Sequence, residues 1–168
     1  YLANQDPHLH FALLTDLPDA EVEERPGEDQ LVRAAADGIA ALNARYGRGQ
    51  ADRFYLFHRH RLWNPSQGVW MGWERKRGKL EEFNRLVRGA TDTSFTTQVG
   101  PLDALAGIKY CITLDSDTQL PRDAARELIG FISHSLNRPV VDPKLRRVID
   151  GYGILQPRVS VTMASAAG

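Results

Sequence analysis

The stretch that decides the fold is Ile108-Lys-Tyr-Cys-Ile-Thr-Leu-Asp-Ser-Asp-Thr118, in which an apolar run ends in two aspartates separated by a serine. β-forming residues dominate from Ile108 to Leu114, which is typical of a buried strand of a parallel sheet. Residues 119–121 favour a turn, and the apolar spacing of residues 122–136 predicts a helix. A strand, an acidic pair at its carboxyl end and a helix form the arrangement in which open α/β sheets bind ligands.

The two carboxylates, Asp115 and Asp117, predict a cation site. Two negative charges this close resist joint burial unless a cation joins them, and hard cations such as Mg²⁺ or Mn²⁺ prefer oxygen ligands and phosphate. A plain alternative stays open, in which an aspartate caps the following helix beside a solvated turn. The pattern Asp-x-Asp alone is too common to decide between the two.

The composition is ordinary for a globular protein, with 42% hydrophobic and 25% charged residues in 168. Because 21 basic and 21 acidic residues give a formal net charge of zero, no global charge favours nucleic acid, and we expect no such partner. The single cysteine, Cys111, falls inside the predicted strand and is expected in the core. No apolar run reaches the roughly 18 residues of a membrane helix. Since the chain starts at Tyr1 without a methionine, we expect a segment of a longer polypeptide, whose other parts can include membrane spans.

The alternation of strands and helices predicts an α/β fold with a mostly parallel sheet flanked by helices. Further strands are predicted at residues 10–15, 53–58, 94–99 and 151–161, further helices at 29–46 and 78–88, and a polar connection at 137–150. His58 and His60 share a strand face, and without a third ligand we expect solvent-facing or loop-bonded side chains rather than a metal pair. The tryptophan-rich loop at 62–73 either packs under a neighbouring element or presents an aromatic face to a sugar or base.

A cluster of cations crowds the amino end of the helix predicted at 78–88, and consists of Arg75, Lys76, Arg77 and Lys79. The helix macrodipole prefers anions there, so the cluster predicts a site for a phosphate or diphosphate, with a solvated basic turn as the alternative. Asp16 follows the first predicted strand, and we expect it to meet the basic turn and the acidic pair at one sheet edge. A carboxylate that holds a base or ribose, cations that hold a diphosphate and a bridging metal together fit a nucleotide-activated donor.

Three segments, Trp70–Leu86, Ile112–Asp123 and Gly151–Ser160, resemble the glycosyltransferase domain of bacterial cyclic β-1,2-glucan synthases, and the resemblance covers essentially the whole chain. More distantly, the pattern is similar to the processive family 2 glycosyltransferases of GT-A fold. The resemblance implies that Asp16 recognises the uridine and that a Lys-x-x-x-x-Asn motif lines the donor site. It also implies that the acidic pair contacts the ribose and the metal-bound diphosphate. The motif corresponds to Lys79 and Asn84, and the acidic pair to Asp117 on the metal and Asp115 in a shared or ribose role.

The resemblance further implies transfer of glucose from UDP-glucose, with inversion, to a growing β-1,2-glucan. Residues 1–168 would then be a partial domain of a multidomain protein of the bacterial inner membrane, with the donor site on the cytoplasmic side. The first strand of an incomplete GT-A sheet would precede Tyr1, and the edge it leaves exposed can pair with another copy. The catalytic base would lie in a later acidic motif outside the chain, so the catalytic residue is unknown here and we expect the isolated chain to be inactive.

Two alternatives stay open. Haloacid-dehalogenase-like phosphotransferases also place Asp-x-Asp after an apolar strand and use Mg²⁺, with the first aspartate, here Asp115, as nucleophile. Their pattern wants Thr or Val two residues after the second aspartate, where Gln119 stands, and places the motif near the start of the domain. The other alternative is a non-catalytic module that serves as scaffold within a longer protein.

Overall fold

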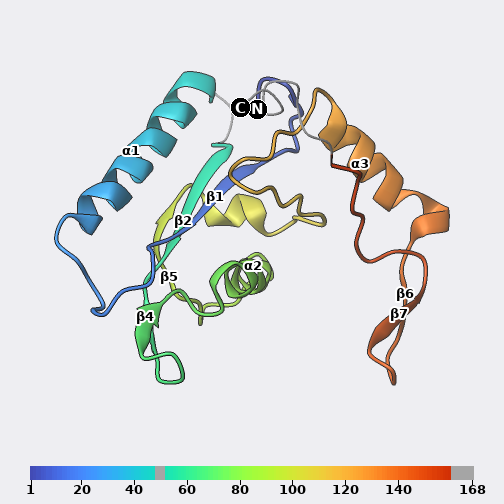
Figure 1. The fold of residues 1–168 in the computed structure, drawn as a ribbon. Coiled ribbons are helices and arrows are strands. Elements are labelled where there is room, and N and C mark those ends of the chain that lie inside the picture. The colour runs from blue at the N-terminus through green and yellow to red at the C-terminus, as the bar shows by residue number, and fades with distance from the viewer. Residues whose placement is uncertain (48–51, 160–168) are drawn as a thin grey trace, which may run out of the picture. The chain divides into compact units, whose positions relative to one another are not determined.

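A computed structural model describes residues 1–47 and 52–159 of the chain (Figure 1). The chain divides into two compact units, one formed by Pro7–Lys109 and the other by Tyr1–Asp6 with Tyr110–Gly168. No helix in the described ranges is long and apolar enough to cross a membrane.

The first unit is built on a three-stranded sheet in the order β1-β2-β5. β1 (Phe11–Asp16) runs parallel to β2 (Phe54–Arg59), and β5 (Phe95–Val99) runs antiparallel to β2. The mixed α/β class is therefore confirmed, and the three strands agree with the predicted ones. The prediction of a mostly parallel sheet is wrong, because the connection from β2 to β5 returns the chain in the opposite direction.

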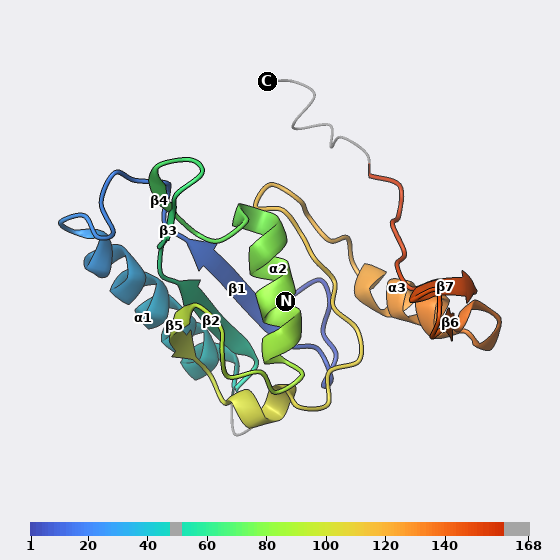
Figure 2. The same cartoon turned by 90° about the horizontal axis from the view of Figure 1, so that it is seen from below.

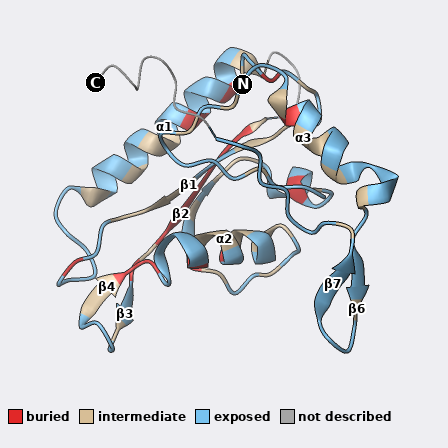
Figure 3. Cartoon of the chain, turned by 45° about the vertical axis from the view of Figure 1, so that its right-hand side comes forward, coloured by how far each residue is buried: buried red, intermediate tan, exposed pale blue. Residues whose placement is uncertain are grey.

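Two helices cover opposite sides of this sheet, α1 (Glu28–Tyr46) and α2 (Arg75–Leu86) (Figures 1 and 2). Their positions follow from the alternation of side chains along β2, since every residue of that strand is buried (Figure 3). Tyr55 and Phe57 pack toward α2, in a core that also holds Phe83 and the short 3₁₀ helix η1 (Leu102–Leu105). On the α1 side, the Asn43 side chain donates to the carbonyl of Phe54 at 2.8 Å and accepts from its amide at 3.0 Å.

The tryptophan-rich segment forms a hairpin of β3 (Leu62–Asn64) and β4 (Val69–Met71) rather than a loop. Trp63 and Trp70 are cross-strand neighbours whose ring centroids lie 5.9 Å apart. β4 is also bridged to Ala20, which is buried, so the hairpin is anchored to the loop that follows β1. Trp63 is 50% exposed, and the hairpin thus packs on one side and presents an aromatic side chain to solvent on the other.

The second unit contains α3 (Ala124–Ser133), the 3₁₀ helix η2 (Ser135–Asn137) and a hairpin of β6 (Val140–Asp142) and β7 (Arg147–Asp150). Asn4 secures the start of α3, because its side chain donates to the carbonyl of Pro121 and accepts from the amide of Ala125, each at 2.9 Å. α3 therefore confirms the helix predicted for residues 122–136 in its existence and type.

Three sequence predictions for the second unit are wrong. Residues 108–114 form no strand, and Cys111 is exposed, because β-forming residues make a strand only where a neighbouring strand accepts their backbone hydrogen bonds. The polar connection at 137–150 is the β6–β7 hairpin, whose turn is fixed by two backbone amides that donate to the Asp142 carboxylate. Residues 151–159 form no strand, and residues 160–161 of that predicted strand lie outside the described residues.

Candidate functional site

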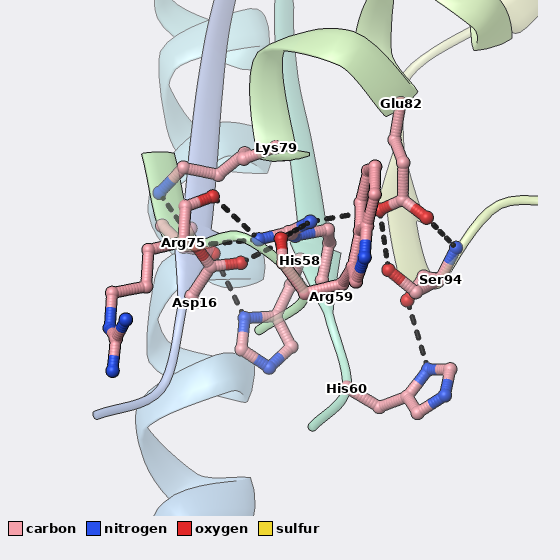
Figure 4. Close-up of polar contacts among 10 residues, drawn as sticks. Asp16, His58, Arg59, His60, Arg75, Lys79, Glu82 and Ser94 are labelled. Atoms are coloured by element: carbon pink, nitrogen blue, oxygen red, sulfur yellow. Dashed lines mark hydrogen bonds and ion pairs between the residues drawn. The ribbon is translucent and has the colours of Figure 1, made fainter. Parts of the chain in front are cut away.

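The parallel strands β1 and β2 end side by side, and their last residues, Asp16 and Arg59, are register partners. The Arg59 guanidinium donates to both oxygens of the Asp16 carboxylate, from Nε to Oδ1 at 2.7 Å and from Nη2 to Oδ2 at 3.2 Å (Figure 4). This is the two-pronged geometry in which arginine holds a carboxylate most firmly. The Asp16 carboxylate is therefore fixed in orientation at the carboxyl end of the sheet.

Lys79 reaches the same carboxylate from α2, with its Nζ 3.0 Å from Asp16 Oδ2 (Figure 4). Side-chain exposure is 20% for Lys79 and 16% for Asp16, whereas Arg59 is fully buried. The structure thus brings together two of the predicted site residues, Asp16 and Lys79, at a position that solvent still reaches.

Sequence reasoning missed the two residues that hold this site from inside, Arg59 and Glu82. Arg59 Nη1 donates to Glu82 Oε2 at 3.0 Å, and Glu82 in turn accepts from the Ser94 hydroxyl at 2.6 Å and the Ser94 amide at 3.2 Å. The sequence signal that could have found Arg59 is the alternation of side chains along β2, which places Arg59 on the same face as Tyr55 and Phe57. A charge on a buried face needs a partner, and Glu82 of α2 supplies it.

Glycine at position 72 leaves room for this pair of charges. A Cβ atom there would lie 2.9 Å from Arg59 Nη2 and 3.0 Å from Asp16 Cγ. Contacts this short would displace the guanidinium or the carboxylate, so the close approach of the β4–α2 connection depends on a residue without a side chain.

The predicted basic turn lies in the first turns of α2, but three of its four cations, Arg75, Arg77 and Lys79, have acidic partners. Arg75 Nη2 donates to Asp19 Oδ2 at 2.7 Å, and Arg77 pairs with Glu74 at 3.2 Å. No acidic residue lies in the first turn of α2 itself. An anionic ligand at this turn would therefore have to displace carboxylates from these cations.

Asn84, the second residue of the predicted lysine–asparagine motif, is exposed on α2. Five residues along a helix correspond to a rotation of about 140°, so Asn84 does not share the face from which Lys79 reaches Asp16. The structure does not bring Asn84 to the Asp16–Lys79 contact.

Asp115 and Asp117 lie in the second unit, in an exposed turn where the amide of Thr118 donates to the carbonyl of Asp115 at 3.0 Å. The prediction that they end a buried strand is wrong, because residues 108–114 form none. Among residues 1–47 and 52–159, no group of three or more His, Cys, Asp or Glu side chains is arranged to hold a metal. Two neighbouring carboxylates still offer the oxygen ligands that a hard cation prefers, with room for ligand phosphates to complete its coordination.

The two histidines line a hollow of about 750 Å³ between the loop before α1 and the end of β2. His60 Nδ1 donates to the carbonyl of Ser94 at 3.0 Å, which confirms a loop-bonded role. His58 is buried rather than solvent-facing, and its Nδ1 lies 2.9 Å from the Thr15 hydroxyl. Burial lowers the pKa of His58 below its ordinary value, and the nearby Asp16 only partly opposes that effect.

The same hollow is closed by a second buried ion pair, between Arg61 and Glu28. Arg61 donates to both carboxylate oxygens of Glu28, at 2.8 and 2.6 Å, and also to the carbonyls of Pro18 and Glu23. The hydrogen bonds from Arg61 lower the pKa of Glu28 to about 2. This pair ties the start of α1 to the end of β2 and so holds the loop that follows Asp16.

Replacing Glu28 by glutamine should lower the free energy of unfolding at pH 7 by about 1–3 kcal/mol, because the buried Arg61 charge loses its partner. The pKa of Glu28 is depressed in the folded state, so its stabilising effect is complete above pH 4.5 and is lost as the pH falls toward 2. Urea unfolding at several pH values should therefore show a shallower acid dependence in Glu28→Gln. Glu24→Gln, at an exposed neighbour, is the control and should keep the original slope; equal slopes in both variants would contradict the assignment.

No family model matches the chain. A search of curated proteins found that the chain is 47% identical, over 167 residues, to the cyclic beta-(1,2)-glucan synthase NdvB of Rhizobium meliloti (strain 1021). The chain is related to a segment of that synthase. The match covers 99% of the chain but 6% of the synthase, so the chain spans a small part of the length of this curated relative.

Proposed function

We propose that the chain is part of the glycosyltransferase domain of a longer, multidomain cyclic β-1,2-glucan synthase and supplies part of its UDP-glucose site. The identity of 47% over 167 residues carries the proposal, because the relative's name gives the product as a cyclic β-1,2-glucan. In this proposal residues 1–168 form an incomplete GT-A domain, and segments of the longer protein complete its sheet. The Asp16–Lys79 contact, at the carboxyl end of parallel strands, lies where such sheets bind ligands.

Four of the predicted site residues have a role in this proposal, whereas Asn84 has none, because it does not share the face of α2 from which Lys79 reaches Asp16. Asp16 accepts a hydrogen bond from the uracil, and Lys79 binds the diphosphate. Asp115 contacts the ribose and shares the cation, and Asp117 binds the Mg²⁺ or Mn²⁺ ion. The exchange of Lys79 between Asp16 and a phosphate is supported by its partial exposure and its flexible side chain.

The roles of these residues in glucose transfer follow from where negative charge develops during the reaction. Cleavage of the glucose–phosphate bond leaves negative charge on the departing UDP, and a metal ion held by Asp115 and Asp117 would supply electrostatic stabilisation of that charge. Lys79 holds the diphosphate in place, and Asp16 holds the base, so the donor is bound at both ends. Transfer with inversion also needs a general base near the acceptor hydroxyl, which we place outside residues 1–168. The isolated chain should therefore bind donor without transferring glucose.

The proposal extends to location and partners. The longer protein would lie in the bacterial inner membrane, with this segment on the cytoplasmic side and a growing glucan as acceptor. Within the described residues β1 pairs with β2 alone, and Leu13 of β1 is 46% exposed. This open edge would take up a strand of the longer protein, or a second copy of the isolated chain.

One observation favours a scaffold role as the second candidate, since Arg59 already neutralises Asp16 without any ligand. A module of this kind would bind no nucleotide. A haloacid-dehalogenase-like phosphotransferase receives no support from the fold, because Asp115 lies in an exposed turn rather than at the end of a strand.

Replacing Lys79 by methionine should weaken UDP binding by the chain about tenfold in the presence of Mn²⁺, because a charge-assisted hydrogen bond to phosphate is lost. The variant should stay folded, since Arg59 still compensates Asp16. Calorimetric titration of UDP into the original chain and the variant gives the comparison.

Lys144→Met is the matched control, because it removes the same charge from the exposed turn of the β6–β7 hairpin. It should leave the affinity for UDP unchanged. Equal weakening in both variants would show that only net charge matters, and no binding by the original chain would favour the scaffold role.

A further inference from the structure

The guanidinium of Arg59 is saturated with hydrogen bonds although its side chain is fully buried. Arginine has five N–H donors. Nε and one Nη2 hydrogen donate to the two carboxylate oxygens of Asp16. The second Nη2 hydrogen donates to the carbonyl of Arg75 at 3.0 Å. The two Nη1 hydrogens donate to the carbonyl of Trp73 and to the carboxylate of Glu82, each at 3.0 Å. One buried residue therefore connects the end of β1, the body of α2 and the backbone at the start of α2 (Figure 4).

The backbone that Arg59 holds is the part of α2 that needs support. Glu74 and Arg75 both have positive φ, of 50° and 47°, a conformation that costs free energy for residues with side chains. α2 also begins without a side-chain cap. By accepting from Arg59, the carbonyls of Trp73 and Arg75 fix this turn, and the turn determines where Lys79 lies.

The charges of the cluster balance only because Arg59 is present. Asp16 and Glu82 carry two negative charges, and Arg59 and Lys79 carry two positive ones. If the Lys79 side chain turned to an anionic ligand, Asp16 would still be paired with Arg59, because the buried Arg59 side chain cannot turn to the ligand with it. Arg59 thus lowers the free-energy cost of releasing Lys79 from Asp16, and it keeps the Asp16 carboxylate in one orientation.

The orientation of Asp16 matters for which base it accepts. A carboxylate offers about four lone-pair positions, and Arg59 and Lys79 occupy three of them on Asp16. The position that stays open accepts a hydrogen bond from an N–H group. Uracil presents an N–H at N3, whereas cytosine presents a lone pair there and carries its nearest N–H on N4, so an Asp16 carboxylate fixed opposite N3 favours uracil over cytosine.

We propose that Arg59 is the positioning residue of the donor site, which aims the Asp16 carboxylate at the base and holds the turn that carries Lys79, and so sets the preference for UDP over CDP. This inference rests on the proposed function and adds a residue to it. Arg59 touches no ligand in this account and acts through Asp16 and through the backbone at the start of α2.

The test compares the affinities of the 168-residue chain for UDP and CDP, by calorimetric titration in Mn²⁺. Arg59→Lys keeps the charge but loses the paired hydrogen bonds, so UDP affinity should fall about tenfold and CDP affinity by less, which lowers the UDP-to-CDP ratio. Arg85→Lys is the control, because it makes the same change in the exposed ion pair that Arg85 of α2 forms with Asp92, away from Asp16. It should leave the UDP-to-CDP ratio unchanged.

A second variant keeps the proposal testable if Arg59→Lys fails to fold. Gly72→Ala adds a methyl group within about 3 Å of both Arg59 Nη2 and Asp16, so it should reduce the UDP-to-CDP ratio without removing a charge. Unchanged ratios in a folded Arg59→Lys variant and in Gly72→Ala, or an equal change in Arg85→Lys, would overturn the positioning role. An original chain that binds UDP and CDP equally would instead overturn the assignment of Asp16 to the base, and no binding at all would overturn the proposed function.

Discussion

Asp117→Asn should lower the incorporation of glucose from UDP-glucose by the longer synthase about 100-fold or more. Asp117 is the carboxylate we assign to the metal ion, and the ion stabilises the charge that develops on the departing UDP. Asparagine keeps the size of the side chain but removes its charge, and the exposed turn at residues 115–118 should fold as before. Membranes that contain the full-length protein, incubated with radiolabelled UDP-glucose and Mn²⁺, give the measurement.

Asp123→Asn is the matched control, because it makes the same change at an exposed aspartate six residues further along. Asp123 has positive φ, which asparagine tolerates well, so glucose incorporation should stay within about twofold of the original. Full activity in Asp117→Asn would remove this residue from the metal site. A similar loss in both variants would point to a disturbed loop instead.

Phe57→Ala should lower the free energy of unfolding of the first unit by about 3–5 kcal/mol. The Phe57 side chain is fully buried, and its ring meets those of Phe83 and Phe95 edge-on, with centroid distances of 5.3 and 5.7 Å. The substitution leaves a cavity between β2, β5 and α2 that rigid strands cannot close. Since domains of this size are stable by about 5–15 kcal/mol, much of the stability would be lost.

Urea unfolding followed by circular dichroism measures this effect. Leu13→Ala on the neighbouring strand is the control, because Leu13 is 46% exposed and should cost about 1 kcal/mol or less. If both substitutions cost the same, Phe57 is not the centre of this core.

Local sequence pattern was sufficient to predict α1, α2 and the three strands of the main sheet in the first unit, but not the strand directions or the β3–β4 hairpin. The helix at Glu28–Tyr46 has an apolar spacing of about 3.6 residues, and the strand at Phe54–Arg59 opens with four consecutive apolar residues, all of them buried. The stretch at 108–114 has equally strong β-forming residues, yet it is not a strand. Its state depends on whether a sheet edge is available to it, and no local pattern contains that information. The β6–β7 hairpin was missed because its strands are short and largely exposed.

The candidate site was predicted in part for the same reason. Asp16 ends a strand and Lys79 lies near the start of a helix, so their meeting followed from the general geometry of α/β sheets. Arg59 and Glu82 were not predicted, because a charged residue in an apolar strand gives no sign of the partner that will neutralise it 23 positions away. Asn84 was assigned by motif spacing alone, and helix geometry turns it away from Lys79.

The proposed function requires UDP to contact Asp16, Lys79 and a metal ion at Asp117. Calorimetric titration of UDP into the 168-residue chain, with Mn²⁺ and again with the metal removed by EDTA, tests it most directly. We predict saturable binding with Mn²⁺ and an affinity at least about tenfold weaker without it. Equal affinity under the two conditions, or the absence of binding under both, would contradict the account.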